Sequence, residues 1–241
     1  MLQYEREAQI LQLLAECPAL RVGDLAKALY TSEATVRRDL SAMEKRGLVR
    51  RVYGGVVLTK EDMPIDFRSK EHASAKREIA AHAALLIRDG DTVFLDASST
   101  AQHLIPHLSR FHDLTVITNS HSALQMLSGS DHRLISTGGH LIPRNMALVG
   151  RTAEAALEYL TPSVAFFSAQ GISESGEITD SSEEETALRR AVLRRAARRV
   201  FLCDTSKLGR HFLYRLCHVS DVDDIITDSA FPTELLENFT P

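Results

Sequence analysis

Apolar residues at helical spacing predict three short helices near the start of the chain. They fall at i, i+3, i+4 and i+7 over residues 10–17 and again over residues 22–29, a pattern typical of helices that bury one face. A third helix is expected to begin after Ser32, whose hydroxyl suits a helix N-cap, and to stop at Gly47. Its predicted core face carries three apolar side chains, Val36, Leu40 and Met43.

Two β-prone runs follow, at residues 48–53 and 56–58, with Gly54 and Gly55 between them. A glycine turn between such runs predicts a β-hairpin. Three helices with a short turn between the second and the third match the helix-turn-helix plan, in which the later helix reads DNA bases. We therefore expect residues 1–58 to form a winged helix-turn-helix domain.

From residue 91 onward, short apolar runs alternate with helical segments. Fully apolar strands in such an alternation predict an α/β fold with a parallel sheet in three layers, covered by helices on both faces. We expect this domain to span residues 76–241, after a polar linker at 59–75 that leads into a helix over residues 67–86. The predicted strands lie at 92–96, 114–119, 132–137, 164–169, 199–204 and 224–228.

Small, hydroxyl-bearing and glycine residues gather at the carboxyl ends of these strands, where ligands bind in such sheets. Residues 98–100 lead into a helix and offer N–H groups and hydroxyls that favour a phosphate. Lys207 would add a cation, and Asp96 and Glu184 would accept hydrogen bonds from hydroxyl groups. The set predicts a site for a small, polyhydroxylated, phosphorylated molecule.

Charge is distributed unevenly along the chain, which is acidic overall. Residues 1–60 hold 10 Lys and Arg against 7 Asp and Glu, whereas the totals of 28 and 32 leave 18 against 25 for the remainder. A basic segment in an acidic chain favours a nucleic-acid contact at one end, because phosphate attraction needs only a local patch. The alternative is an ordinary solvated charged helix.

The predicted third helix carries small residues and cations on its outward face. Ala34, Arg38, Ser41 and Lys45 lie opposite the apolar face, with Arg37 on the flank. Short side chains permit close approach to the major groove, and arginine can bind guanine edges or phosphates. This face is therefore the predicted DNA-reading surface, with a three-helix docking module as the alternative.

The string SEATVRRDLSAMEKRGLVRRVYGGVVL resembles the DNA-binding half of the DeoR family of bacterial transcriptional regulators. The recognition helix of that family typically reads S-x-x-T-[IV]-R-[RK]-D-L, and its wing ends in H/Y-G-G. Asp39 lies toward the core side of the helix, so we expect it to orient arginine or backbone groups and not to read a base. The residues predicted to bind DNA are Ser32, Ala34, Thr35, Arg37, Arg38, Ser41, Lys45, Arg50, Arg51, Tyr53, Gly54 and Gly55.

The resemblance extends over nearly the whole chain. DGDTVFLDASSTAQHL, ITNS, STGG, ALVG, SEEE and DTSKLGR are similar to later signatures of the family. Its C-terminal domain is similar in fold to ribose-5-phosphate isomerases and CoA transferases and senses sugar phosphates or related metabolites. Ser98 and Gln170 depart from the usual family residues, which leaves the effector open. The implied effector site comprises Asp96, Ser98, Ser99, Thr100, Thr118, Asn119, Gly138, Gly139, Gly171, Glu184 and Lys207.

The combined prediction is a sequence-specific regulator of a carbohydrate-metabolism operon, in the family's usual sense a repressor. It would bind double-stranded operator DNA, respond to a phosphorylated sugar, and form a homodimer or homotetramer that spaces two recognition helices. The main alternative is a sugar-phosphate isomerase with Asp96, Glu184 and Lys207 in catalytic roles. Because an isomerase has no use for groove-reading arginines, we expect no enzyme activity. A scaffold without a ligand is the third alternative.

The cysteines and two histidines do not predict a disulfide or a metal site. Cys17, Cys203 and Cys217 form no CxxC motif and are odd in number, so we expect reduced, mostly buried thiols without a zinc site or disulfides. His103 and His107 have the spacing of a zinc pair but no nearby third ligand, so we expect no metal and no cofactor.

The sequence also predicts where the protein is located, and it contains a second basic run. No run approaches the roughly 18 apolar residues of a membrane span, and the N-terminus lacks the apolar core of a signal peptide, so a cytoplasmic protein without membrane contact is expected. The basic run at 189–199 follows three glutamates. It is interpreted as a solvated helix face that matches the helix dipole.

Overall fold

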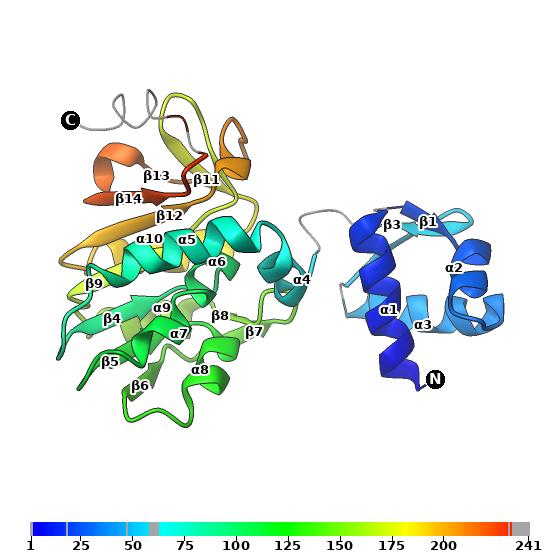
Figure 1. Cartoon of the computed structure of the whole chain (residues 1–241), viewed down its shortest axis with the longest axis horizontal. Coiled ribbons are helices and arrows are strands. Elements are labelled where there is room, and N and C mark those ends of the chain that lie inside the picture. Colours follow the sequence, from blue (N-terminus) through cyan, green and yellow to red (C-terminus); the bar gives the residue numbers. More distant parts are fainter. Residues whose placement is uncertain (1, 18, 47, 58–62, 231, 233–241) are drawn as a thin grey trace. The chain divides into compact units, whose positions relative to one another are not determined.

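Figure 1 presents the computed structural model of the chain, which describes residues 2–17, 19–46, 48–57, 63–230 and 232. The chain divides into two compact units, Met1–Arg68 and Ser69–Pro241. This division falls within the predicted linker, of which residues 59–62 lie outside the described residues. In the described ranges, no helix combines the length and apolar character that crossing a lipid bilayer requires.

The first unit is a three-helix domain with a small antiparallel sheet. The helices close over one apolar core, in which Ile10, Leu25 and Met43 have no exposed surface. These are the periodic positions that predicted the helices, and the predicted stop at Gly47 lies outside the described residues. The elements are α1 (Gln3–Glu16), β1 (Ala19–Arg21), α2 (Val22–Ala28), α3 (Glu33–Lys45), β2 (Arg50–Val52) and β3 (Gly55–Val57).

The wing differs in detail from the predicted hairpin. Strands β2 and β3 pair antiparallel, and the turn between them is Tyr53 and Gly54, with Gly54 at φ 74°. Gly55 therefore begins β3 and does not belong to the turn. Strand β1, which no apolar run indicated, pairs with the other edge of β3. A Cβ atom on Gly55 would lie 2.5 Å from the carbonyl oxygen of Leu20, so this close crossing requires glycine.

The single helix predicted over residues 67–86 is two helices. These are α4 (Ile65–Lys70) and α5 (Ala73–Ala84), and His72 between them has a left-handed backbone with φ 50°. A helix cannot continue through a residue in that conformation. The prediction failed because the polar residues at this point of the sequence contain neither glycine nor proline to mark the break.

All six predicted strands form one parallel sheet in the second unit. The strand order is β14-β12-β9-β4-β5-β6, and every neighbouring pair is parallel. This confirms the α/β prediction. The strands are β4 (Thr92–Leu95), β5 (Thr115–Thr118), β6 (Arg133–Ser136), β9 (Val164–Phe167), β12 (Arg199–Cys203) and β14 (Asp224–Thr227).

Helices cover both faces of this sheet, which gives the three predicted layers (Figure 1). Along β4, Val93 and Leu95 pack with α5 and the helices α6 to α8, whereas Phe94 packs with α9 and α10. Alternate side chains of a strand point to opposite faces, so a strand buried on both sides is apolar throughout. The helices are α6 (Ser99–Gln102), α7 (Ile105–Leu108), α8 (His121–Leu127), α9 (Arg151–Leu157) and α10 (Glu183–Leu193).

Two small antiparallel sheets supplement the main sheet and were not predicted. One is the hairpin of β7 (His140–Ile142) and β8 (Ala147–Val149). The other has the order β10-β11-β13. These strands are short and mix polar with apolar residues, so they give no periodic signal. Their bounds, with those of two 3-10 turns, are β10 (Gly171–Ile172), β11 (Glu177–Asp180), β13 (Tyr214–His218), η1 (Thr205–Lys207) and η2 (Val219–Asp221).

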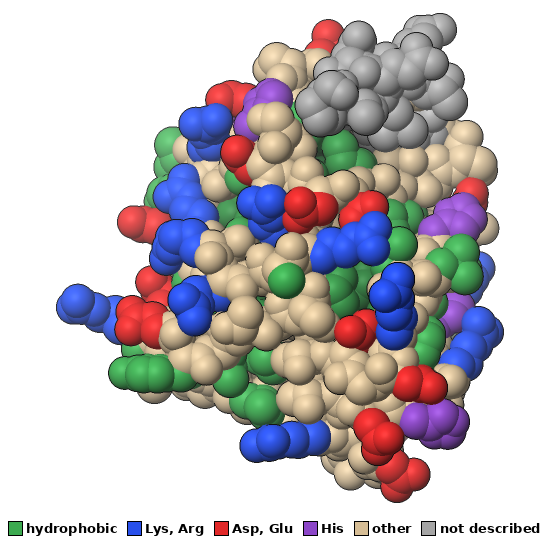
Figure 2. Space-filling view, turned by 90° about the vertical axis from the view of Figure 1, so that its left-hand side faces the viewer, with side chains coloured by type: hydrophobic (Ala, Val, Ile, Leu, Met, Phe, Trp, Pro, Cys, Tyr) green, Lys and Arg blue, Asp and Glu red, His purple; other side chains and the backbone are tan. Residues whose placement is uncertain are grey.

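Acidic and basic side chains are interspersed on the face of the second unit in Figure 2. Ion pairs between such side chains occur at the starts of β12 and β14. Arg198 pairs with Asp224 at 2.6 Å, and Arg199 pairs with Asp223 at 2.9 Å. Because the charges on this face largely compensate one another, it does not offer the one-sign surface that favours duplex DNA.

Candidate DNA-binding surface and effector site

The outward face of α3 exposes the predicted cations. Arg37, Arg38 and Lys45 are exposed together with Ala34, and Ser41 is half-buried. The start of the helix is fixed by its cap, because the Ser32 hydroxyl accepts a hydrogen bond from the Thr35 amide at 3.2 Å. A small residue beside cations at the start of a helix is the arrangement that a major groove admits.

A buried ion pair fixes α3 against α1. Asp39 is 1% exposed, and its carboxylate accepts two hydrogen bonds from the Arg6 guanidinium, at 2.7 and 3.2 Å. The hydrogen bond to Asp39 raises the pKa of Arg6. The predicted structural role of Asp39 is thus confirmed. Sequence reasoning did not identify Arg6, because its partner lies 33 residues away.

Further charged contacts link α3 to α1 and to the wing. The Arg46 guanidinium donates to Glu7 at 2.5 Å, and the backbone N–H of Arg51 donates to the Glu44 carboxylate at 2.8 Å. The latter bond connects the end of α3 with β2. Helix α3 and the wing are therefore linked, while Arg50 and Arg51 of β2 remain exposed.

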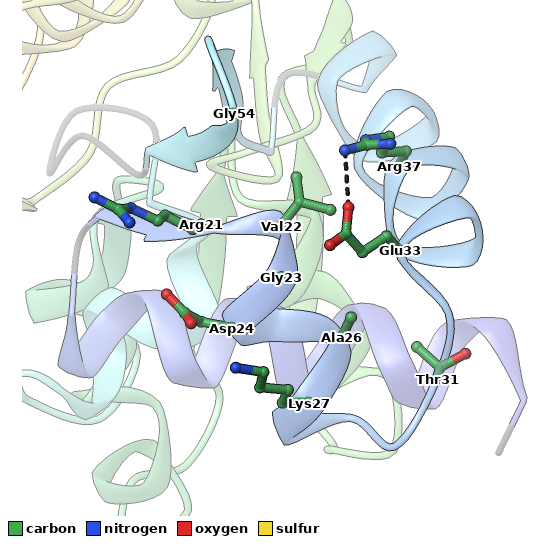
Figure 3. Close-up of a pocket in the computed structure, with 10 residues that line it drawn as sticks. All are labelled: Arg21, Val22, Gly23, Asp24, Ala26, Lys27, Thr31, Glu33, Arg37 and Gly54. Atoms are coloured by element: carbon green, nitrogen blue, oxygen red, sulfur yellow. Dashed lines mark hydrogen bonds and ion pairs between the residues drawn. The ribbon is translucent and has the colours of Figure 1, made fainter.

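A cavity of about 520 Å³ lies where α2, the start of α3 and the wing turn meet (Figure 3). Arg21, Lys27 and Arg37 contribute cations to its lining. The dashed line in Figure 3 marks the contact between Arg37 and Glu33, at 2.8 Å, with side chains 58% and 51% exposed. Such an exposed pair contributes little stability, so Arg37 is available to exchange its partner for a phosphate. Within the described residues, Arg38 makes no ion pair.

The wing places most, but not all, of its predicted residues at the surface. Arg50, Arg51, Tyr53 and Gly54 are exposed. Gly55 is buried, and its close approach to β1 gives it a structural role. An exposed aromatic ring between cations and a glycine turn is suited to contact the DNA backbone.

In the second unit, the structure brings Lys207 to the start of α6, at residues 98–100. The Lys207 ammonium donates to the Thr100 hydroxyl at 3.1 Å and to the Ser168 hydroxyl at 2.5 Å. The Ser98 hydroxyl caps α6 by accepting from the Ala101 amide at 3.1 Å. These groups follow β4, β9 and β12, so they meet at the carboxyl edge of the sheet, as the sequence predicted.

Asp204 completes the surroundings of Lys207. Its carboxylate lies 3.4 Å from the ammonium, and it accepts hydrogen bonds from the backbone and hydroxyl of Ser206. Burial alone would raise the pKa of Asp204, but Lys207 and the Ser206 hydrogen bond outweigh it, and the pKa is lowered. Asp204 therefore stays ionised at neutral pH, beside the Lys207 side chain and its two hydroxyl partners.

Asp96 lies behind the start of α6 and bonds to groups of the protein. Its carboxylate is 2% exposed, binds Arg189 at 2.8 Å, and accepts from the amides of Ser98 and Ser168. Arg189 also binds Asp180 at 2.9 Å and lies 3.6 Å from Glu185. Burial opposes the charge of Arg189, but the three carboxylates raise its pKa. Asp96 thus positions the start of α6, and a direct contact with effector stays a prediction.

The other predicted effector residues have varied surroundings. The Thr118 hydroxyl donates to the Leu95 carbonyl at 2.7 Å, which links β5 to β4. Asn119 donates to the Leu148 carbonyl, while its own side-chain oxygen is buried without a partner in the described structure. An unsatisfied buried acceptor is costly, and an effector contact of Asn119 stays a prediction.

The remaining predicted residues lie just before β7, on α10 and on β10. Gly139 needs its missing side chain, because a Cβ atom would lie 2.3 Å from the Val149 carbonyl oxygen. Glu184 pairs with His140 at 2.9 Å, and both side chains are exposed. Gly138 adopts φ 65° after β6, and Gly171 is buried in β10. Effector contacts for these residues stay predictions.

Sequence reasoning missed the partners that organise this site. Ser168, Arg189 and Asp204 contact the predicted residues directly. Asn145 donates to Glu185 at 2.5 Å and so ties the β7–β8 hairpin to α10. Ser168 and Asp204 lie inside the predicted strands 164–169 and 199–204, but the observed strands β9 and β12 end one residue before them. Nothing local marked Arg189.

The next features are the possible metal ligands and the three cysteines. Within the described ranges, no three His, Cys, Asp or Glu side chains gather as metal ligands would. Cys17 is exposed, which corrects the expectation of mostly buried thiols, while Cys203 is buried and Cys217 is half-buried. Burial raises the pKa of both Cys203 and Cys217 to about 12, so these thiols stay protonated at neutral pH.

Comparison with known families decides the identity of both units. The family model described as a DeoR-like helix-turn-helix domain matches residues 6–62, and the DeoR C terminal sensor domain matches residues 71–229. The chain belongs to the DeoR family. The resemblance drawn from the recognition helix is thereby confirmed. The second unit is accordingly the sensor domain of a DeoR-family transcriptional regulator.

Individual relatives align with nearly the whole chain. It is 32% identical over 243 residues to the HTH-type transcriptional regulator GolR of Listeria innocua, covering 99% of this chain and 96% of that protein. It is 29% identical over 236 residues to the lactose phosphotransferase system repressor of Staphylococcus epidermidis, covering 95% and 93%. These relatives are transcriptional regulators, so the chain is a DNA-binding regulator and the isomerase alternative is not favoured.

One solved structure with a similar fold is eIF2B delta from Chaetomium thermophilum. The TM-score is 0.50 at 17% identity, and the match covers 67% of this chain and 58% of that chain. The chain thus spans little more than half of that structure. At this identity the likeness concerns the fold alone, and it agrees with the α/β architecture of the sensor domain.

Proposed function

We propose that this DeoR-family regulator binds double-stranded operator DNA through the outward face of α3 and the β2–β3 wing. It would repress a carbohydrate-metabolism operon until a phosphorylated sugar binds the sensor domain. The observation that carries the DNA contact is Arg38, an exposed cation for which the described structure offers no carboxylate partner, on a helix fixed by the buried Arg6–Asp39 pair. Phosphate and guanine are the acceptors that would satisfy such an arginine.

The Lys207 ammonium supports the choice of effector. It rests on the hydroxyls of Thr100 and Ser168, which are neutral acceptors that a phosphate can replace with a stronger, charge-assisted bond. The unsatisfied oxygen of Asn119 suits a sugar hydroxyl. The similarity to a lactose phosphotransferase system repressor favours a sugar-related signal.

A homodimer or homotetramer fits this function. Two α3 helices must reach half-sites separated by about 34–36 Å, one turn of DNA. Effector binding would change the affinity for operator by a coupling free energy of typically about 1–3 kcal/mol. Because the partner is chromosomal DNA, we place the protein in the cytoplasm.

The test begins with selection of an operator from random duplexes by the full-length protein. Fluorescence anisotropy on that operator then measures affinity with and without a panel of pentose and hexose phosphates and their unphosphorylated parents. We expect at least one phosphate ester to lower the affinity while its parent sugar does not. Failure to select any sequence would overturn the DNA proposal, and equal effects of ester and parent would overturn the phosphate proposal. Conversion of any ester to its isomer would revive the enzyme alternative.

A further inference from the structure

A second concave site lies on the sensor domain, away from the strand ends that hold Lys207. It is a cavity of about 440 Å³ between α10, the start of β12, and β13. Two leucines, Leu193 and Leu216, line it with apolar surface. We call it the arginine pocket, because four arginines from these three elements converge on it: Arg190, Arg194, Arg199 and Arg215.

Two of the four arginines are neutralised by carboxylates outside the cavity lining. Arg199 binds Asp223 through two nitrogens, at 2.9 and 3.1 Å. Arg215 lies 3.2 Å from Glu177, and both side chains are partly exposed. These carboxylates compensate the charges of Arg199 and Arg215, so these two arginines offer little uncompensated charge to an anion.

The other two arginines keep their charge. Arg190 donates to the backbone carbonyls of Leu216, at 3.3 Å, and of Arg215, which positions the guanidinium without neutralising it. In the described part of the chain, neither Arg190 nor Arg194 forms an ion pair with a carboxylate. The pocket therefore presents two uncompensated guanidinium groups over an apolar lining.

Arg190 lies in the last turn of α10, and Arg194 is the C-cap of that helix, four positions further on. This i, i+4 spacing places both on one side of the helix end, where like charges repel. The C-terminal end of a helix favours cations, which accounts for basic residues at this end. It does not account for the two further arginines that β12 and β13 direct to the same cavity. An anion between Arg190 and Arg194 would relieve the repulsion.

Other groups in the pocket limit what can bind. Burial keeps the Cys217 thiol protonated, so it adds no negative charge. Asp221 lines the pocket and accepts a hydrogen bond from the His218 amide. Asp221, Asp223 and Glu177 around one small cavity would repel an extended polyanion such as a duplex, but they leave room for one compact phosphate group.

We propose that the arginine pocket binds the phosphate group of a small phosphorylated molecule, with the phosphate between Arg190 and Arg194 and the rest of the ligand on Leu193 and Leu216. Arginine is suited to this because its planar guanidinium can donate two parallel hydrogen bonds to phosphate oxygens. The cavity is within the size range of small-molecule sites. This site is separate from the proposed effector site and does not depend on it.

Inorganic phosphate is the probe, titrated into the full-length protein at constant ionic strength and followed through backbone amide NMR shifts. We expect saturable shifts at residues 193–194 and 216–217. Arg194→Glu should abolish these shifts or weaken binding by at least about tenfold, while any shifts at residues 99–100 persist. Arg195→Glu is the matched control, because Arg195 is the exposed neighbour outside the cavity lining, and it should bind as the wild type does.

The outcomes separate this proposal from the proposed function. Saturable shifts at residues 99–100 alone would support the effector site and overturn the arginine pocket. Shifts at the pocket alone would support it and count against a phosphate at Lys207. Unsaturable shifts spread over many arginines, or equal losses in Arg194→Glu and Arg195→Glu, would also overturn it. If Arg194→Glu does not fold, Arg194→Gln removes the charge with less disturbance and must show the same loss.

Discussion

At the residue scale, Arg38 is the side chain on which DNA recognition most directly depends. We expect Arg38→Ala to weaken operator binding by about 1–3 kcal/mol if the guanidinium reads a base, and to relax preference at one position. Arg37 must first leave Glu33, but that exposed pair is weak, so Arg37→Ala should also reduce affinity. Anisotropy at fixed salt measures both. Arg151→Ala, an exposed arginine of the sensor domain, is the control, and affinity equal to this control would remove Arg38 from the interface.

Tyr30, in the turn between α2 and α3, carries backbone strain. Its φ is 50°, a left-handed conformation that is unfavourable for a residue with a Cβ atom. The residue is 96% exposed, so packing of the side chain does not offset this cost. Tyr30→Gly should stabilise the DNA-binding unit by about 0.5–1 kcal/mol, less than the full strain because glycine gains entropy when unfolded. Urea unfolding measures the change. Tyr30→Ala keeps the Cβ atom and should show no such gain; an equal gain would attribute the effect to the side chain.

Residue roles could be predicted where the signal was local. Ser32 as an N-cap and Asp39 as an inward acid followed from positions on one helix, and both are seen. The bond of Asp96 with Arg189, 93 residues away, was not predicted, while a contact of Asp96 with effector stays a prediction. A partner so distant in sequence leaves no trace in spacing or periodicity. Long-range pairing is therefore what the sequence alone could not supply.

At the element scale, the wing depends on a close crossing of strands. Gly55→Ala would bring a Cβ atom to 2.5 Å from the Leu20 carbonyl oxygen, and backbone at that position cannot yield cheaply. We expect a loss of about 1–3 kcal/mol in stability, typical of overpacking, together with weaker operator binding as the wing shifts. Urea unfolding and anisotropy test this. Gly54→Asn is the control, since no atom crowds Gly54 and asparagine tolerates positive φ; a greater loss there would contradict the crossing as the cause.

Helices and strands that are well buried could be predicted from the sequence, whereas short and partly exposed ones could not. The six parallel strands were predictable because strands covered on both faces must be apolar, as Val93 to Leu95 are. Strands β1, β7 and β8 were not predicted because each has only three residues and is partly exposed. The break at His72 was missed because it depends on a backbone conformation that histidine rarely adopts.

At the scale of the whole molecule, Arg189 links distant parts of the sensor domain. It joins α10 to Asp96 after β4 and to Asp180 at the end of β11. Arg189→Met should destabilise that domain by about 3–5 kcal/mol, because buried carboxylates would lose their cation. Thermal unfolding followed at two wavelengths should show a lower transition temperature for this variant than for the wild type. Arg195→Met, an exposed change on the same stretch of chain, should leave the transition in place; an equal drop would show that the charge cluster is not responsible.

The pH dependence of global stability tests the Lys207–Asp204 pair. The pKa of Asp204 is lowered in the folded protein, so its ionisation stabilises the fold above the unfolded value of about 3.9. That contribution should be lost as the pH falls through the folded pKa. Asp204→Asn should therefore be less stable than the wild type by about 1.5–3 kcal/mol at pH 7. The difference should hold to about pH 5 and shrink toward pH 3. Urea unfolding across this range measures it, and a difference independent of pH would show that Asp204 acts through shape and not through charge.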